Sequence, residues 1–181
     1  MSAPASPQPV KLITSLLTGM PPLIDEVCEE LRERFGAIDF VSEALPFNYT
    51  SYYEAELGSN LMRRMVSFQK LISPDALPSI KLATNTIEHR FADNQGKRKI
   101  NIDPGYIALS HLILATCKGF AHRSYLQNGV YADLTLVFQA HTFRALEWTF
   151  PDYKSADMIR LLNTMRDNYL KQLRSMTPDA A

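Results

Sequence analysis

The residues best suited to acid–base chemistry or anion binding are concentrated between Gly96 and Asp133. This stretch contains histidines, aspartates and several basic side chains. A histidine takes up and releases protons near neutral pH, and Arg and Lys bind phosphate or carboxylate oxygens. The stretch therefore predicts a site for an anionic ligand, and the flanking segments predict a scaffold. No motif with an assigned reaction occurs in it.

His122 and Asp133 are the candidates for acid–base catalysis, and a predicted hairpin brings them together. Asn128-Gly129 is a strong signal for a two-residue type I′ turn, because both residues tolerate positive φ. Such a loop pairs Ser124 with Asp133 and places His122 diagonal to Asp133 on a polar face. Two alternatives stay open: these side chains simply face water, or a β-bulge reverses the faces.

A second polar group precedes the hairpin. The sequence Asp103-Pro104-Gly105-Tyr106 fits a type II turn, in which Pro sets φ at the first central position and Gly supplies positive φ at the second. Asn101 and Asp103 share a face of the incoming strand, and Asp103 is the third candidate catalytic residue. Two oxygen ligands are too few for a metal site. Arg98 and Lys118 add positive charge suited to phosphate, although lone basic residues in loops are usually solvated.

Two other segments supply candidate ligand contacts. On a predicted helix, Lys81, Asn85 and Glu88 form a polar row that is either an exposed flank or one wall of a cleft. The polar loop around Tyr49 and Tyr52 carries aromatic rings that either stack on a ligand or anchor the loop by burial. The candidate ligand-binding residues are Tyr53, Glu54, Asn85, Glu88, Arg98, Asn101, Lys118 and Arg123.

The composition indicates an ordinary globular protein. Nineteen basic residues balance nineteen acidic residues among 181, so DNA binding is not expected, and attraction to RNA would need a local patch such as Lys97–Lys99. Cys28 and Cys117 are too few for a disulfide framework or a zinc site, and both are interpreted as small buried residues. The chain shows no signal-peptide pattern and no run of about 18 apolar residues, which indicates a cytoplasmic protein without membrane contact.

The hydrophobic pattern predicts one α+β domain over residues 10–174. The predicted elements are a strand (10–18), a helix (23–35), two strands (37–47 and 61–72), a helix (from 73 to about 91), a strand (99–103), a run at 106–117, the hairpin, and a C-terminal helix (155–174). The first six follow the split βαβ, ferredoxin-like order. Residues 1–9 are predicted to be a disordered leader and residues 175–181 a frayed tail.

Several runs resemble the signature blocks of a known family, domain of unknown function 4416. The runs are YTSYYEAELG (49–58), SFQKLI (67–72), IKLATNTIE (80–88), KRKINIDPGY (97–106), LATCKGFAHRSYLQNGVYADLTL (114–136) and WTFPDY (148–153). The resemblance spans nearly the whole predicted domain. It implies a small bacterial protein, and some members bear the name "GTP-binding protein", although this chain lacks the Gly-rich loop of P-loop NTPases.

The resemblance also implies which positions matter. Carried onto this chain, the family pattern points to Tyr53, Glu54, Glu56, Gly58, Asn85, Glu88, Arg98, Asn101, Asp103, Gly105, Tyr106, Lys118, His122, Arg123, Tyr125, Pro151, Asp152 and Tyr153. The chain departs from the pattern at Cys117 (Thr expected), Ser124 (branched apolar), Asp133 (Glu) and Phe150 (Tyr). Asp133 has a shorter reach than Glu toward His122.

The favoured hypothesis is a small cytoplasmic protein that binds, and as an enzyme acts on, a phosphorylated ligand such as a nucleotide or RNA end. In it His122 is the acid or base, Asp133 orients it, and Arg98, Lys118 and Arg123 bind phosphate oxygens. One alternative is a non-catalytic nucleotide- or RNA-binding module, and another is a protein-interaction adaptor. The sequence identifies no cofactor and does not decide whether the protein is an enzyme.

Overall fold

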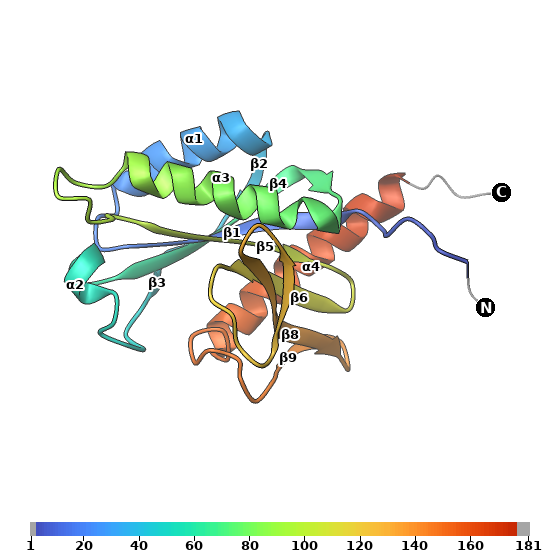
Figure 1. The fold of residues 1–181 in the computed structure, drawn as a ribbon. Coiled ribbons are helices and arrows are strands. Elements are labelled where there is room, and N and C mark those ends of the chain that lie inside the picture. The colour runs from blue at the N-terminus through green and yellow to red at the C-terminus, as the bar shows by residue number, and fades with distance from the viewer. Residues whose placement is uncertain (1–2, 177–181) are drawn as a thin grey trace.

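The computed structural model describes residues 3–176. In chain order the elements are β1 (Val10–Thr18), α1 (Leu23–Phe35), β2 (Ile38–Val41), β3 (Leu45–Pro46), α2 (Glu54–Leu57), β4 (Met62–Ile72), the 3₁₀ turn η1 (Pro74–Ala76), α3 (Leu77–Arg90), β5 (Asn101–Ile107), β6 (His111–Thr116), β7 (Arg123–Gln127), β8 (Val130–Gln139), β9 (Thr142–Ala145) and α4 (Ala156–Met176). The predicted α+β class, the hairpin and the C-terminal helix are confirmed (Figure 1).

The strands in this part of the chain form one antiparallel sheet with the order β2-β4-β1-β5-β6-β8-β7, in which β3 also pairs with β4 and β9 with β8. Strands β1, β2, β4 and β5 and the helices α1 and α3 have the split βαβ arrangement that the sequence predicts. Strand β1 lies between β4 and β5 and is buried along its whole length. It is therefore the centre of the domain.

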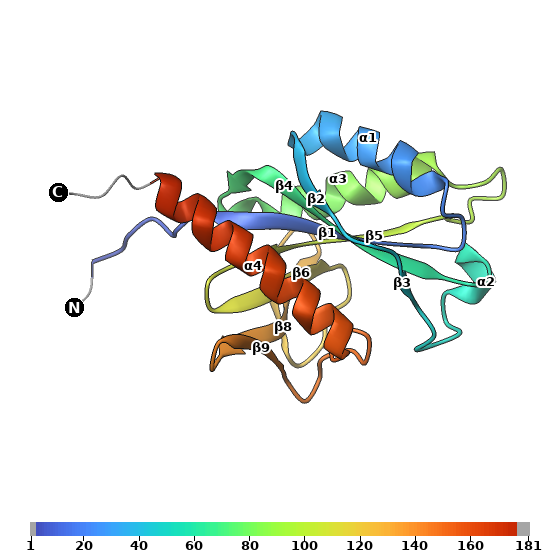
Figure 2. The same ribbon diagram turned by 180° about the vertical axis from the view of Figure 1, so that it is seen from behind.

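Helices cover both faces of the sheet (Figures 1 and 2). On one face, α1 and α3 pack over Leu12, Leu16 and Phe68, whereas α4 crosses the opposite face over Ile13 and Met65. The period of two in β1 sends successive side chains to opposite faces, which gives each face its own apolar core. The residues that α4 buries are Met158, Leu162, Met165 and Tyr169.

Several element boundaries differ from the prediction. The single strand predicted for residues 37–47 is two short strands, because Ser42 leaves the regular ladder: its N–H donates to the Met65 carbonyl, and its Oγ accepts from the Met65 N–H, both at 2.9 Å. The predicted Tyr-rich loop contains the short helix α2, and α3 begins at Leu77 after the 3₁₀ turn. Strand β9 has no counterpart in the prediction.

The ends of the predicted domain lie near the ends of the described chain. Residues 3–9 are exposed and belong to no helix or strand, although the Pro9 carbonyl accepts a hydrogen bond of 2.6 Å from Tyr169 Oη. Helix α4 continues to Met176, so Ser175 and Met176 of the predicted tail are helical. Residues 1–2 and 177–181 lie outside the described residues. None of the helices in the described range is long and apolar enough to cross a bilayer.

The predicted type II turn at Asp103–Tyr106 is wrong, because these residues lie inside β5. Gly105 is needed for the close approach of β6: a Cβ atom here would lie 2.3 Å from the Ile113 carbonyl oxygen. Pairing of β5 with β6 begins at Gly105, so Pro104 has a neighbouring strand on one side only. The Pro and Gly that resemble a turn instead mark the point where strand pairing stops.

The predicted hairpin is present, but its register is wrong by one residue on β7. The turn residues Asn128 and Gly129 have φ values of 53° and 74°, as a type I′ turn requires. Leu126 is an extra residue in β7, so Arg123 lies opposite Asp133, where the prediction placed Ser124. The bulge that the sequence left open as an alternative therefore decides which side chains share a face.

Candidate functional site

The sheet opens between β5 and β6, and a cleft occupies the opening. The two strands pair only over Gly105–Ile107 and Leu112–Leu114, so the first half of β5 has no strand on that side. The cleft has a volume of about 750 Å³, which is within the usual range for ligand pockets. Its walls come from α3, the loop that contains α2, the end of β6 and the segment before α4.

Two side chains of α3 replace the missing strand. The Ile102 N–H donates to Glu88 Oε1 at 2.5 Å, and the Ile102 carbonyl accepts from Lys81 Nζ at 3.1 Å. A paired β6 would otherwise satisfy these backbone groups. Because backbone groups alternate along a strand, Pro104 faces the same opening and has no N–H that needs an acceptor there. The polar row of α3, which also includes Asn85, is therefore a wall of the cleft and not an exposed flank.

Asp103 lies in this wall beside cationic side chains. Its carboxylate accepts hydrogen bonds from Asn101 Nδ2 at 2.6 Å and from Lys81 Nζ at 3.2 Å. Burial alone would raise the pKa of Asp103, but the charges of Lys81 and Arg63 and these hydrogen bonds outweigh it and hold the pKa below its ordinary value. Asp103 is therefore an ionised hydrogen-bond acceptor at neutral pH.

Arg98 joins three parts of the structure around the cleft. Its Nε and Nη2 bind both carboxylate oxygens of Glu56 at 2.6 and 2.7 Å, and its Nη1 reaches Glu88 at 3.0 Å and Asn101 at 3.1 Å. The hydrogen bonds that Arg98 donates to Glu56 raise the pKa of Arg98 further, and the same bonds lower the pKa of Glu56. Arg98 thus fastens α2 to α3 and β5.

The most buried ion pair at the cleft joins Arg63 of β4 to Asp152, which precedes α4. Arg63 Nη1 lies 3.0 Å from Asp152 Oδ2, and each residue is 6% exposed. The guanidinium group also lies over the rings of Phe47 and Tyr153, 4.9 and 5.2 Å from their centres. Arg63 Nε has no hydrogen-bond partner among residues 3–176. Burial raises the pKa of Tyr153, which keeps its phenol neutral.

Asp133 connects Arg123 and His122. Arg123 Nε donates to Asp133 Oδ2 at 2.8 Å, and His122 Nε2 lies 3.3 Å from the same oxygen. Asp133 and Arg123 line the cleft, but His122 does not. Its ring instead stacks on Trp148, with ring centres 5.1 Å apart and planes at 13°. The predicted proximity of His122 and Asp133 is present, but of the two only Asp133 lines the cleft.

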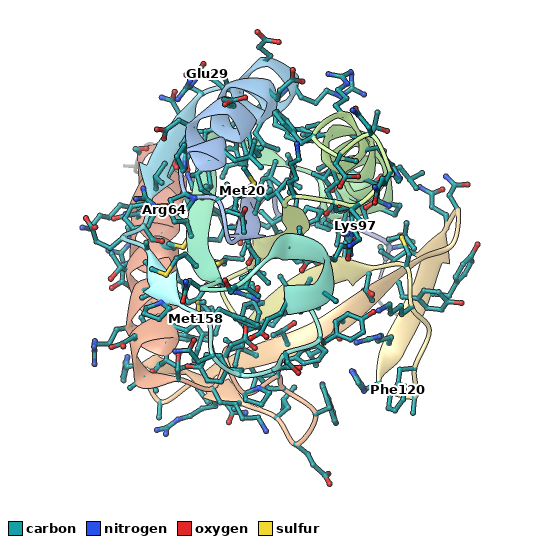
Figure 3. The ribbon with its side chains drawn as sticks, turned by 90° about the vertical axis from the view of Figure 1, so that its left-hand side faces the viewer. Met20, Glu29, Arg64, Lys97, Phe120 and Met158 are labelled. Carbon is teal, nitrogen blue, oxygen red and sulfur yellow. The ribbon has the colours of Figure 1, made fainter. Side chains whose placement is uncertain are left out.

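Lys118 differs from the other cations of the cleft because no carboxylate oxygen of the described chain lies within 4.0 Å of it. Its Nζ lies 3.4 Å from Tyr52 Oη and 5.2 Å from the centre of that ring. Tyr49, Tyr52 and Phe150 also line the cleft and are exposed. The Tyr-rich loop is therefore an accessible aromatic wall. Phe120 is also exposed, and it lies in the β6–β7 loop at the periphery of the molecule (Figure 3).

The structure brings most of the predicted site residues together. Those that line the cleft are Tyr53, Asn85, Glu88, Arg98, Asn101, Asp103, Lys118, Arg123 and Asp133. Neither Glu54 nor His122 lines the cleft. On α2 it is Glu56, not Glu54, that binds Arg98. Cys117 is exposed at the cleft, contrary to the prediction that both cysteines are buried, whereas Cys28 is buried.

Sequence reasoning missed several cleft residues. Arg63 belongs to a strand whose pattern carries no motif, and Phe47 is an apolar residue at the end of a predicted strand. Asp152 and Tyr153 are implied as site residues by the family pattern, whereas the residues alone predict a packed segment before the last helix. Within residues 3–176, no group of three or more His, Cys, Asp or Glu side chains is arranged to hold a metal ion.

Together these features define a class of protein: an α+β domain with a ferredoxin-like core and an aromatic-walled, charge-paired cleft where its sheet opens. The chain belongs to the family described as Domain of unknown function (DUF4416), whose model matches residues 8–169. Searches among curated proteins and among solved structures found no significant match.

Proposed function

We propose that the protein binds a phosphorylated small molecule with a planar ring, such as a nucleotide, in the cleft between β5 and β6. The observation that carries this proposal is Lys118, a cation without a carboxylate partner in the described chain, beside the exposed ring of Tyr52. A free cation next to an accessible aromatic face suits a ligand that has both an anionic group and a ring.

The rest of the cleft supplies groups for the remainder of such a ligand. Tyr49 and Phe150 add stacking surface at the exposed side of the cleft. Asp103 offers an ionised acceptor for hydroxyl or amino groups, as a ribose or a base would present. The volume of about 750 Å³ is within the range for drug-sized or cofactor-sized ligands.

The arrangement supports binding more directly than catalysis. His122, the candidate acid or base, stacks on Trp148 and does not line the cleft, whereas Asp133 does, so a ligand in the cleft would contact Asp133. In this proposal Asp133 positions Arg123, and His122 supports Asp133. The proposal places the protein in the cytoplasm, which agrees with the free thiols of Cys28 and Cys117.

An RNA end is a second candidate ligand, because three exposed aromatic residues line the cleft and further bases could stack beyond the first. These residues are Tyr49, Tyr52 and Phe150. The balance of acidic and basic residues over the whole chain favours the small molecule, since RNA binding draws on a basic surface.

A thermal-shift screen tests the proposal. The probes are the four ribonucleoside 5′-monophosphates, ribose 5-phosphate and a short oligoribonucleotide with a terminal phosphate. Because a ligand that binds only the folded state stabilises it by about 2.7 kcal/mol at 100 times its Kd, at least one probe should raise Tm by several degrees. Lys118→Ala should lose this shift, and Lys171→Ala, an exposed lysine on α4, should keep it.

The other outcomes of the screen separate the alternatives. A shift with the oligoribonucleotide alone would favour the RNA end. Chromatography of the probes after incubation reports turnover, which would make the protein an enzyme. No shift with any phosphorylated probe would contradict the proposal and favour a protein-interaction adaptor.

A further inference from the structure

We propose that the ligand of this cleft carries a single phosphate group, so that a nucleoside monophosphate fits and the corresponding triphosphate does not. The inference rests on the proposed function and adds the charge of the ligand to it. It follows from the partners of the cationic side chains at the cleft, considered one by one.

Four cations of the cleft are already neutralised by carboxylates of the protein. The pairs are Arg63–Asp152 at 3.0 Å, Lys81–Asp103 at 3.2 Å, Arg98–Glu56 at 2.6 Å and Arg123–Asp133 at 2.8 Å. A pair with no net charge offers little attraction to an incoming phosphate, and each carboxylate repels it. Arg98 also contacts a second carboxylate, Glu88, at 3.0 Å, so it is not free to bind a ligand.

Two of the four paired cations, Lys81 and Arg123, are also held in place by the backbone. Lys81 Nζ donates to the Ile102 carbonyl at 3.1 Å, and Arg123 Nη1 donates to the Lys118 carbonyl at 2.9 Å. If either side chain turned toward a phosphate, it would leave a backbone acceptor without its donor and a carboxylate without its lysine or arginine. These cations therefore stay with the protein when a ligand enters.

Lys118 is the remaining lysine or arginine of the cleft lining, and both its backbone and its ammonium group have a contact. The Arg123 hydrogen bond holds its carbonyl, and the Tyr52 ring lies 5.2 Å from its Nζ. One ammonium group carries a single positive charge, and a phosphate monoester carries about −1.5 to −2 near neutral pH, so Lys118 can offset at most one phosphate group. The second and third phosphates of a triphosphate would extend among carboxylates or into solvent, without a cation to meet them.

Isothermal titration calorimetry in metal-free buffer tests the inference. Each of four nucleosides is compared with its 5′-monophosphate and its 5′-triphosphate, so that the identity of the base does not decide the result. For the base that binds best, we expect the monophosphate to bind at least about tenfold more tightly than the nucleoside, which corresponds to one favourable charged contact. We expect the triphosphate to bind at least about tenfold more weakly than the monophosphate.

Variants of Lys118 assign the effect. Lys118→Gln keeps most of the stem and should reduce the affinity for the monophosphate to that for the nucleoside, while leaving nucleoside binding unchanged. Lys118→Arg should retain the preference for the monophosphate, and Lys171→Ala on α4 should match the wild type in every titration.

Two results would overturn the inference and leave the proposed function intact. One is a triphosphate that binds as tightly as the monophosphate, and the other is an equal loss of nucleoside and monophosphate binding in Lys118→Gln. If the wild type binds none of the nucleosides or nucleotides, the proposed function is wrong and the inference falls with it.

Discussion

On one side of β5 the pairing with β1 extends from Asn101 to Ile107, whereas on the other side the pairing with β6 covers only the last three of these residues. In the closed region, neighbouring strands satisfy the backbone, and apolar side chains such as Leu16 and Val66 fill the space above it. In the open region, Lys81 and Glu88 satisfy the backbone of Ile102, and ion pairs surround the space. At the cleft, buried charged side chains thus take the place of a paired strand, so the stability of this region depends on electrostatic interactions.

The largest effect is expected from the most buried of these charges. Arg63→Met should lower the free energy of unfolding by about 3–5 kcal/mol, because it leaves Asp152 buried without its cation. Urea denaturation at neutral pH measures this loss. The control is Arg64→Met on the adjacent position of β4, which faces the other side of the sheet and should change the value by less than about 1 kcal/mol.

A double variant sharpens the same comparison. Arg63→Met combined with Asp152→Leu removes both charges and should recover much of the lost stability, since a buried ion pair replaced by apolar residues is often neutral. If the double variant is as unstable as the sum of the single variants, the loss comes from packing and not from an unpaired charge.

Glu88 tests whether side chains really replace the missing strand. Glu88→Ala should lower the free energy of unfolding by about 2 kcal/mol, because the Ile102 N–H loses its acceptor in a buried position. Native-state hydrogen exchange should show faster exchange of the Ile102 amide than the global destabilisation explains. Glu88→Gln retains an acceptor oxygen and should restore part of the protection. Unchanged protection of this amide in Glu88→Ala would show that another group satisfies it.

Arg98 is expected to have a smaller and more local effect. Arg98→Lys replaces a two-bond contact with Glu56 by a single point charge, so we expect a loss of about 1–2 kcal/mol. The loss should appear as faster hydrogen exchange in α2, with little change in the closed part of the sheet. Uniformly faster exchange throughout the domain would mean that Arg98 stabilises the whole fold and does not only fasten α2.

The fold could be predicted largely because its signals are local. Apolar residues recur with helical spacing in α1 and α4, and the Asn128-Gly129 turn fixes the hairpin. The turn predicted at Pro104 and Gly105 is wrong because Pro and Gly are common both in turns and at points where strand pairing ends. Which of the two occurs depends on how far β6 follows β5, and no short window of sequence encodes that.

The candidate site also contains both contacts that follow from local sequence and contacts that only the fold creates. Asn101 and Asp103 lie two apart on one strand, so their contact follows from the period of a strand. The Arg63–Asp152 pair joins residues far apart in the chain, and only the folded sheet brings them together. A bulge of one residue was enough to put Arg123 opposite Asp133, which shows how little of a side-chain cluster is decided before register is known.

The smallest expected effect is a dependence on pH that distinguishes two carboxylates of the cleft. Neighbouring cations lower the pKa of Asp103, so the unfolded chain takes up this proton first as pH falls. The stability that Asp103 contributes is therefore present above its unfolded pKa of about 3.9 and is lost as pH falls through the lower folded pKa. Relative to Asp103→Asn, the wild type should be more stable by about 1 kcal/mol at neutral pH, and this advantage should shrink in acid.

Glu88 should show the opposite sign, since burial raises its pKa in the folded protein. Its contribution is present below its unfolded pKa of about 4.3 and is lost as pH rises through the higher folded pKa, so the wild type should lose stability relative to Glu88→Gln as pH increases from about 4. Urea unfolding between pH 3 and pH 7 measures both differences. If the curve for Asp103 slopes in the direction expected for Glu88, neighbouring cations do not lower the pKa of Asp103, and burial governs both carboxylates.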